Sequence, residues 1–300
     1  MSKLREMDKL LSDLKGYQIV GNHSAVKTCL WLKKSLKDEG SCYKQKFYGI
    51  KSHRCLQMTP ALICNQNCVY CWRPLELLKD FKGWDSPDFI VEESIKAQRR
   101  LLSGFHGTEG VNKKKLAEAY EPNQVAISLI GEPTIYPRLP ELIDCFNRKG
   151  FTTFLVTNGT NPEMLEKCDP TQLYVSLTAF DEQSHLMLNR PVKSNWDKIM
   201  KSLEVLRNAK SRTVLRLTLI KDYNMQDNAI EKYAELINKA SPDFIEAKAY
   251  MFLGYSRLRL KYENMPEHED VLDFSKKLSE KCGYKIRDEA KVSRVVLLER

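Results

Sequence analysis

Three cysteines at short spacing are the residues of this sequence best suited to chemistry. Cys64, Cys68 and Cys71 follow a C-x3-C-x2-C pattern directly after an apolar stretch. A loop of that size can bring three thiolates to three corners of one iron–sulfur cube, so that the fourth iron has no protein ligand. An open metal position is where an exogenous ligand binds in a catalytic metal site. The spacing therefore predicts a cluster that binds a small molecule.

A structural zinc site is the alternative for these cysteines. Zinc in such sites takes four Cys or His ligands, commonly as a second pair at short spacing. No fourth ligand follows Cys71, and the nearest histidines on either side are His53 and His106. The number of available ligands favours the iron–sulfur cluster.

Three further cysteines are evenly spaced upstream of this triplet. Cys29, Cys42 and Cys55 form a C-x12-C-x12-C series. Isolated free cysteines usually lie in a core, but polar and basic residues flank Cys42 and Cys55, which argues against simple burial. Three thiolates from separate segments could hold a second cluster with a free iron, and soft ligands favour iron–sulfur or zinc. The remaining cysteines have no such spacing, and we interpret them as structural: Cys145, Cys168 and Cys282.

Six short apolar segments, separated by helical patterns, must position these groups. They are the segment before Cys64 and residues 124–130, 152–157, 172–177, 213–220 and 244–251. Their near-continuous apolar, β-branched composition is typical of buried parallel strands. Six such strands predict an α/β fold, an incomplete (β/α)6 barrel of the TIM type, with its chemistry at the carboxyl ends of the strands.

Helical patterns flank the predicted barrel at both ends. Apolar spacing predicts helices over residues 3–15 and from Ser24 to Gly40, and a later helix that begins near Pro266. Residues 294–298 are a predicted final strand. We expect residues 1–55 to form an N-terminal helical, cluster-binding extension, and residues 56–300 to form the barrel domain with a C-terminal extension.

Composition limits the class of protein. The 300 residues carry a net charge of +9, which fits an anionic partner or a generally basic protein equally well. Mean hydropathy is −0.45, and no apolar run approaches the roughly 20 residues of a membrane span. Nine cysteines without a signal-peptide core indicate reduced thiols and metal ligation rather than disulfides. We therefore expect a cytoplasmic protein with no membrane segment.

The triplet Cys64, Cys68 and Cys71 resembles the cysteine motif of the radical S-adenosylmethionine (radical SAM) enzymes. In that family the open iron binds the amino and carboxylate groups of S-adenosylmethionine, and one electron from the cluster cleaves it to methionine and a 5′-deoxyadenosyl radical. Residues 42–60, the Cys-Trp-Arg-Pro at 71–74 and residues 250–257 narrow the resemblance to the tRNA 4-demethylwyosine synthases. The chain resembles their single-domain archaeal form, which implies an external electron donor of the flavodoxin or ferredoxin type.

The resemblance also implies contacts to S-adenosylmethionine at the strand ends. Gly131 and Glu132 resemble the Gly-Glu motif that holds the amino group of the cofactor's methionine, although an ordinary β–α turn would look similar. The family commonly uses further polar groups at these ends, and the candidates here are Thr157, Asn158, Ser176 and Thr178. Arg216 and Lys248 lie within predicted strands, where each could meet the cofactor carboxylate or form a structural ion pair.

The implied activity condenses pyruvate with N1-methylguanosine at position 37 of phenylalanine tRNA, forming the tricyclic 4-demethylwyosine of the wybutosine pathway. It requires two [4Fe–4S] clusters and S-adenosylmethionine, and we expect a monomer. Lys44 and Lys46 are candidates to bind pyruvate as a Schiff base. The free iron of the upstream cluster could instead chelate pyruvate, which we favour because a three-thiolate cluster leaves a vacant position.

Two other functions fit the same cysteines. One is a different radical SAM oxidoreductase with an auxiliary electron-transfer cluster, acting on a peptide. The other is a non-catalytic iron–sulfur or zinc protein that binds RNA, for which the basic charge and the arginine–aromatic stretch at residues 254–259 would serve equally well.

Overall fold

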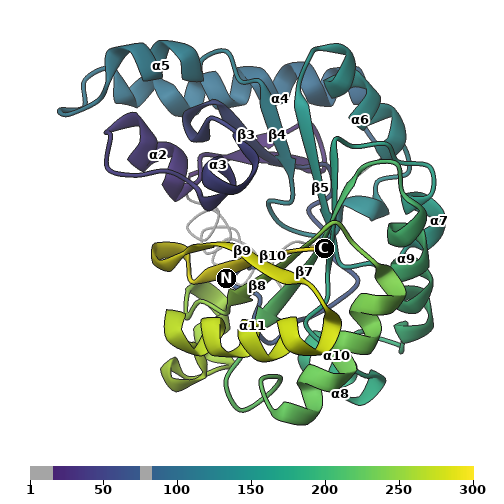
Figure 1. Cartoon of the computed structure of the whole chain (residues 1–300). Helices are drawn as coiled ribbons and strands as arrows, with labels where there is room; N and C mark the ends of the chain where they lie inside the picture. The colour runs from purple at the N-terminus through teal and green to yellow at the C-terminus, as the bar shows by residue number, and fades with distance from the viewer. Residues whose placement is uncertain (1–15, 75–82) are drawn as a thin grey trace, which may run out of the picture.

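The computed structural model describes residues 16–74 and 83–300. Within these ranges ten strands form one sheet in the order β1-β2-β3-β4-β5-β6-β7-β8-β10-β9 (Figure 1). The strands are β1 (Tyr17–Val20), β2 (Ser24–Lys27), β3 (Cys55–Thr59), β4 (Gln124–Ile127), β5 (Thr152–Thr157), β6 (Gln172–Ser176), β7 (Arg212–Leu219), β8 (Phe244–Ala249), β9 (Lys285–Ala290) and β10 (Val295–Glu299).

Strands β3 to β8 are parallel and follow one another in chain order, which confirms the six predicted barrel strands. The first and last of them do not meet. Strand β3 pairs with β2 and β8 pairs with β10, both antiparallel, so the barrel remains open. The predicted incomplete barrel is therefore confirmed.

Helices cover the outer face of the sheet. The helices of the described part of the chain, on either face, are α2 (Leu30–Leu36), α3 (Tyr43–Tyr48), α4 (Pro87–Leu102), α5 (Lys113–Ala119), α6 (Leu139–Arg148), α7 (Pro162–Leu165), α8 (Glu182–Asn189), α9 (Trp196–Asn208), α10 (Asp227–Ala240) and α11 (His268–Cys282). In α10 the buried Ile230, Tyr233 and Ile237 recur at helical spacing and join the main core against the sheet. None of the described helices has the length and apolar character that crossing a membrane requires.

Helix α3 packs on the inner face of the sheet instead. Its Tyr43 and Phe47 form a second core with Phe154, Tyr174 and other inward residues of the strands. The next residue of each strand, such as Leu155, belongs to the main core under the outer helices. This alternation has the period of two expected of a strand, so α3 occupies the inside of the open barrel.

The N-terminal prediction is partly wrong. Residues 3–15 lie outside the described residues, and the helix predicted from Ser24 begins only at Leu30. Residues 24–27 form β2, because an extended chain pairs Ala25 and Val26 with β3 and buries both completely. Pairing between β2 and β3 also crosses the predicted domain boundary at residue 55.

Candidate active site

The loop after β3 carries the first cysteine triplet. Cys68 is buried, and Cys64 and Cys71 are partly buried. Backbone hydrogen bonds fix the loop: the N–H of Cys71 donates to the carbonyl of Cys68 at 3.1 Å, and the N–H of Val69 donates to Leu188 of α8 at 2.8 Å. The loop is therefore shaped by its own turn and by the end of α8.

The three thiols lie within electrostatic range of one another. Burial raises the pKa of Cys64 to about 12, and the Glu132 carboxylate and the Cys71 thiol add to this effect. Burial also raises the pKa of Cys68, and Cys64 and Cys71 raise it further. Among residues 16–74 and 83–300, no three His, Cys, Asp or Glu side chains converge on one point that a single metal ion could occupy. A cube binds each thiolate to a different iron, so its ligands surround a volume, and the donor set fits such a cluster.

The second set of cysteines is also brought together, although its members come from three separate elements. Cys29 caps α2, where its Sγ accepts from the N–H of Leu32 at 3.3 Å; Cys42 directly precedes α3, and Cys55 begins β3. Burial raises the pKa of Cys55, and the neighbouring Cys29 and Cys42 thiols raise it further. This arrangement could hold a second cluster.

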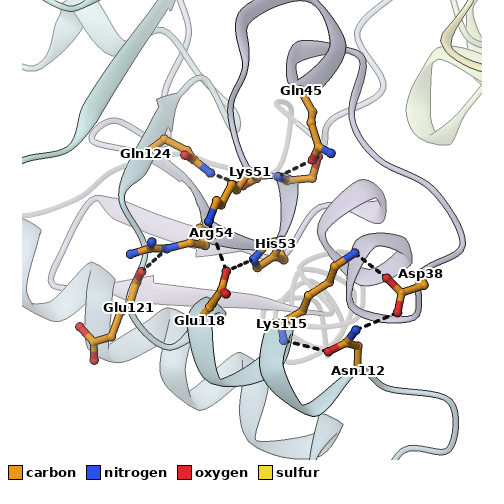
Figure 2. A network of polar contacts seen from close by, with 11 residues as sticks. Asp38, Gln45, Lys51, His53, Arg54, Asn112, Lys115, Glu118, Glu121 and Gln124 are labelled. Atoms are coloured by element: carbon orange, nitrogen blue, oxygen red, sulfur yellow. Dashed lines mark hydrogen bonds and ion pairs between the residues drawn. The ribbon is translucent and has the colours of Figure 1, made fainter.

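Polar contacts with α5 and with the residues directly after it fix the segment that leads into Cys55 (Figure 2). In the short 3₁₀ helix η1 (Ser52–Arg54), His53 Nε2 lies 2.8 Å from Glu118 Oε2, and Arg54 Nε donates to the carbonyl of Glu121 at 2.9 Å. His53 is buried, and its contact with Glu118 links η1 to α5. The same segment reaches Cys42, whose N–H donates to Ser52 Oγ at 2.9 Å.

Gly131 allows the next loop to approach the cysteine loop closely. Its φ is +74°, and a Cβ there would lie 2.1 Å from the carbonyl oxygen of Ala61 and 2.5 Å from that of Ile63. The following N–H, of Glu132, donates to Ile63 at 2.8 Å. Only glycine fits this position, because both the backbone angle and the space exclude a side chain.

The Glu132 carboxylate is buried and links two strand ends. Oε1 accepts from Thr134 Oγ1 and Thr157 Oγ1, each at 2.7 Å, and Oε2 accepts from the N–H of Asn158 at 2.8 Å. Burial raises the pKa of Glu132, and hydrogen bonds from Thr157, Asn158 and Thr134 oppose that rise. Each carboxylate oxygen accepts about two hydrogen bonds. Oε2 has one such bond within the described residues, so it can accept another from an ammonium group.

The two remaining predicted cofactor ligands lie at the carboxyl end of β6. Ser176 ends that strand and is half-buried. Thr178 is buried, and its side chain lies beside the buried hydroxyl of Tyr70. The structure therefore brings Glu132, Thr157 and Asn158 together at two strand ends, whereas Ser176 and Thr178 lie at the end of β6.

The two candidate lysines have different environments. Lys44 Nζ lies 4.4 Å from the ring centroid of Tyr174 and 4.7 Å from that of Phe154, inside the barrel. Burial and the neighbouring Arg216 lower the pKa of Lys44. Lys46 is about half exposed (54%) and forms an ion pair with Asp288 at 2.5 Å. Only the first of these lysines faces the interior next to Cys42 and Cys55.

A buried ion pair beside Lys44 was not resolved from the sequence. Arg216 Nη2 lies 2.8 Å from Glu246 Oε2, and the hydroxyl of Tyr43 donates to the same oxygen at 3.0 Å. This contact supports the structural ion pair over a cofactor ligand for Arg216. Lys248 donates to the carbonyl of Ser293, and burial lowers its pKa to about 8. Alternation along β8 places Glu246 and Lys248 on one face, a signal that could have pointed to Glu246.

The arginine–aromatic stretch at residues 254–259 contacts the first cysteine loop. A Cβ at Gly254 would lie 2.3 Å from the carbonyl oxygen of Trp72, and the N–H of Tyr255 donates to the same oxygen at 3.3 Å. Arg259 donates to the carbonyl of Cys71. The stretch after β8 therefore borders the first cysteine loop.

An open barrel whose cysteine loop follows its first parallel strand defines the class of this protein. A family model described as the radical SAM superfamily matches residues 58–234, and one described as wyosine base formation matches residues 239–300. The chain is a radical SAM enzyme. That class uses S-adenosylmethionine and a [4Fe–4S] cluster, as predicted from the triplet.

Comparisons with individual proteins narrow the class. The chain is 55% identical to an S-adenosyl-L-methionine-dependent tRNA 4-demethylwyosine synthase of Pyrococcus abyssi, over 95% of this chain and 86% of the relative. It is 45% identical to a protein of the same description from Methanocaldococcus jannaschii, over 94% of this chain and 92% of that relative. A solved structure of TYW1 with a lysine–pyruvate adduct bound has a TM-score of 0.89 and 44% identity, and the match covers 98% of this chain and 95% of that one. The chain belongs to the tRNA 4-demethylwyosine synthase family, which confirms the resemblance found in its sequence.

Proposed function

We propose that this protein condenses pyruvate with N1-methylguanosine at position 37 of phenylalanine tRNA to form 4-demethylwyosine. The names of its relatives support the tRNA product. The observation that carries the pyruvate half is Lys44, a half-buried amine inside the barrel, beside the second set of cysteines.

Cys64, Cys68 and Cys71 would hold the radical SAM cluster. With S-adenosylmethionine bound, that cluster supplies a carbon-centred radical. Glu132 Oε2 would accept a hydrogen bond from the amino group of the cofactor. Hydrogen bonds from Thr157 and from the backbone of Asn158 hold that carboxylate in place. Gly131 keeps this acceptor close to the cysteine loop. Ser176 and Thr178 supply further polar groups at the next strand end.

Lys44 would bind pyruvate as an imine. Sequence reasoning favoured chelation by iron, but a lysine–pyruvate adduct in a relative 44% identical to this chain supports the amine. A lysine whose pKa is lowered by burial is neutral more often near pH 7 and is then nucleophilic. Lys46 lacks that environment, because its ammonium is half exposed and paired with Asp288.

The upstream cysteines Cys29, Cys42 and Cys55 would hold a second [4Fe–4S] cluster next to this lysine. Cys42 directly precedes α3, the helix that carries Lys44, and Cys42 and Cys55 both act to raise the pKa of that lysine. An external donor of the flavodoxin or ferredoxin type would reduce the clusters. The modified base would leave the anticodon stack to reach the strand ends, and the net charge of +9 suits a phosphate backbone. We expect the enzyme to act as a cytoplasmic monomer.

Anaerobic reconstitution followed by two assays tests this function. About eight irons per chain are expected, since two cubes hold four each. Transfer RNA that carries N1-methylguanosine should gain the tricyclic base only with pyruvate, S-adenosylmethionine and a reductant. A protein that binds the tRNA but cleaves no cofactor would indicate a non-catalytic RNA-binding protein. If the protein cleaves S-adenosylmethionine but forms no tricyclic base when pyruvate and tRNA are present, it catalyses a different radical SAM reaction.

A further inference from the structure

Arg73 is a buried cation that no carboxylate of the described residues pairs with. Its side chain is 7% exposed, and among the described residues no Asp or Glu forms an ion pair with it. Its Nη1 donates to the hydroxyl of Tyr17 at 2.6 Å, and its guanidinium stacks on Trp72, with Cζ 3.7 Å from the ring centroid. A buried charge is costly unless an opposite charge compensates it. Because no carboxylate of the described residues does so, we expect an anion of another kind, such as a cluster with its thiolates, to face Arg73.

Tyr17 joins Arg73 to a second cation from the other cysteine-bearing segment. In the β1–β2 ladder Tyr17 is paired with Lys27, and Lys27 Nζ lies 4.2 Å from the Tyr17 ring centroid. Arg73 follows Cys71 by two residues, and Lys27 precedes Cys29 by two. The two cysteine-bearing segments therefore meet at the Tyr17 side chain, which contacts Arg73 from one segment and Lys27 from the other.

Both sets of cysteines have a member close to this pair of cations, Cys71 two residues before Arg73 and Cys29 two residues after Lys27. Burial lowers the pKa of Arg73, whereas Tyr17, Cys71 and Cys29 act to raise it. Cys71 belongs to the first set and Cys29 to the second. The guanidinium is thus within electrostatic range of a proposed ligand of each cluster.

We propose that Arg73, supported by Lys27 across Tyr17, is a shared counter-cation of the two clusters and raises the reduction potential of both. This inference rests on the proposed second cluster. Reduction adds one negative charge to a cluster, and net charge near a cluster is one of the factors that set its potential. A nearby cation stabilises the reduced form more than the oxidised form. Burial keeps salt from screening the interaction.

Other charged groups near the cysteines act on one set each. Glu132 lies near Cys64, and its negative charge opposes reduction of the first cluster. Lys44 lies near Cys42 and Cys55. Lys33 lies near Cys29 but is exposed, so solvent screens its charge. These residues allow a shared effect to be separated from a local one.

Redox titrations of the reconstituted full-length chain, followed by electron paramagnetic resonance, test the proposal. In Arg73→Gln the midpoint potentials of both clusters should shift to more negative values. Arg73→Lys keeps the positive charge, so both midpoint potentials should lie close to those of the wild type. Lys33→Gln removes the same charge from an exposed position beside Cys29 and should leave both potentials close to those of the wild type.

Two results would overturn the proposal. The first is unshifted potentials in fully loaded Arg73→Gln, and the second is a shift of one cluster alone. Unshifted potentials combined with at least tenfold weaker binding of pyruvate or S-adenosylmethionine would identify Arg73 as a carboxylate-binding residue instead. If Arg73→Gln does not load, Lys27→Met is used, and an unshifted cluster at Cys29 then refutes the shared role.

The iron content of the wild type separates this proposal from the proposed function. About four irons per chain would remove the second cluster, and the shared role of Arg73 with it. About eight irons with unshifted potentials in the loaded variants would refute only the role of Arg73.

Discussion

The ammonium group of Lys44 lies 4.4 Å from the centre of the Tyr174 ring, inside the barrel. The two residues are far apart in the sequence, and they meet because α3 packs against the inner face of β5 and β6. An aromatic wall removes water from the amine, while Arg216 adds positive charge nearby. This contact gives Lys44 the environment of a nucleophilic amine and leaves Lys46, two residues later, at the surface.

The first prediction separates these two lysines. Lys44→Arg should abolish trapping of pyruvate by borohydride, because arginine keeps the charge but cannot form the imine. Lys46→Arg should trap as well as the wild type. Mass spectrometry of the reduced protein measures the adduct and locates it by peptide.

Iron content measured on both variants is the control for this experiment. Equal iron shows that the second set of cysteines is intact in each. Undiminished trapping in a fully loaded Lys44→Arg variant would exclude Lys44 and return the choice to chelation by iron.

The second prediction concerns the contact between Gly131 and the cysteine loop. Gly131→Ala places a Cβ 2.1 Å from the carbonyl oxygen of Ala61, so one of the two loops must move. Gly49→Ala is a matched control, since Gly49 has nearly the same φ, +73°, with no atom within 4 Å of the added Cβ. The control should lose roughly 1–2 kcal/mol, the cost of a left-handed backbone.

Gly131→Ala should lose more than about 4 kcal/mol, or fail to load the first cluster, because it adds a backbone clash to the same strain. Urea midpoints and iron content measure both variants. Equal losses in the two variants would show that the close approach of Gly131 to Ala61 is unimportant.

The barrel strands were predictable because each is a short, continuous apolar segment. Residues 152–157 match β5 at both ends, and the other predicted strands differ by a few residues at their ends. Strand β9 was missed. Its sequence, Lys285–Ala290, is charged and exposed, because an edge strand with one neighbour has little core to face.

The cluster ligands could be predicted from spacing, but their surroundings could not. Cys29, Cys42 and Cys55 are evenly spaced in the sequence, yet they lie on a cap, a loop end and a strand. Tyr17 and Arg73 are separated by 56 positions, and only the folded sheet brings them together. Long-range contacts of this kind leave no local pattern in a single sequence.

The third prediction tests the buried ion pair below Lys44. Arg216→Met leaves the buried Glu246 carboxylate without its ion-pair partner, and the nearby Lys44 and three tyrosine hydroxyls then have to compensate its charge: Tyr43, Tyr48 and Tyr174. Removal of one partner of a buried pair typically costs about 3–5 kcal/mol. Urea midpoints of variants with equal iron content measure the loss.

Arg212→Met is the matched control for Arg216→Met. Arg212 lies on the same strand, donates to Gln172 Oε1 at 2.6 Å and stacks on Tyr48, but it pairs with no carboxylate in the described residues. Its loss should stay near 1 kcal/mol, the value of a typical hydrogen bond. If both variants lose the same stability, the ion pair is not what holds this part of the barrel interior.

The fourth prediction concerns the polar contacts that hold the segment before Cys55 (Figure 2). Glu118→Ala removes the acceptor of His53, 2.8 Å away, and the longer contact to Lys51 at 3.7 Å. Residues that support metal ligands typically contribute 10–100-fold to metal affinity. A chelator should therefore remove iron from the second cluster about tenfold faster in this variant, while the first cluster keeps its rate.

Asp38→Ala is the control, because it breaks another ion pair of α5, with Lys115, that does not involve η1. Its iron loss should match the wild type. Equal acceleration in the two variants would mean that α5 as a whole, rather than the link from Glu118 to His53, protects the cluster.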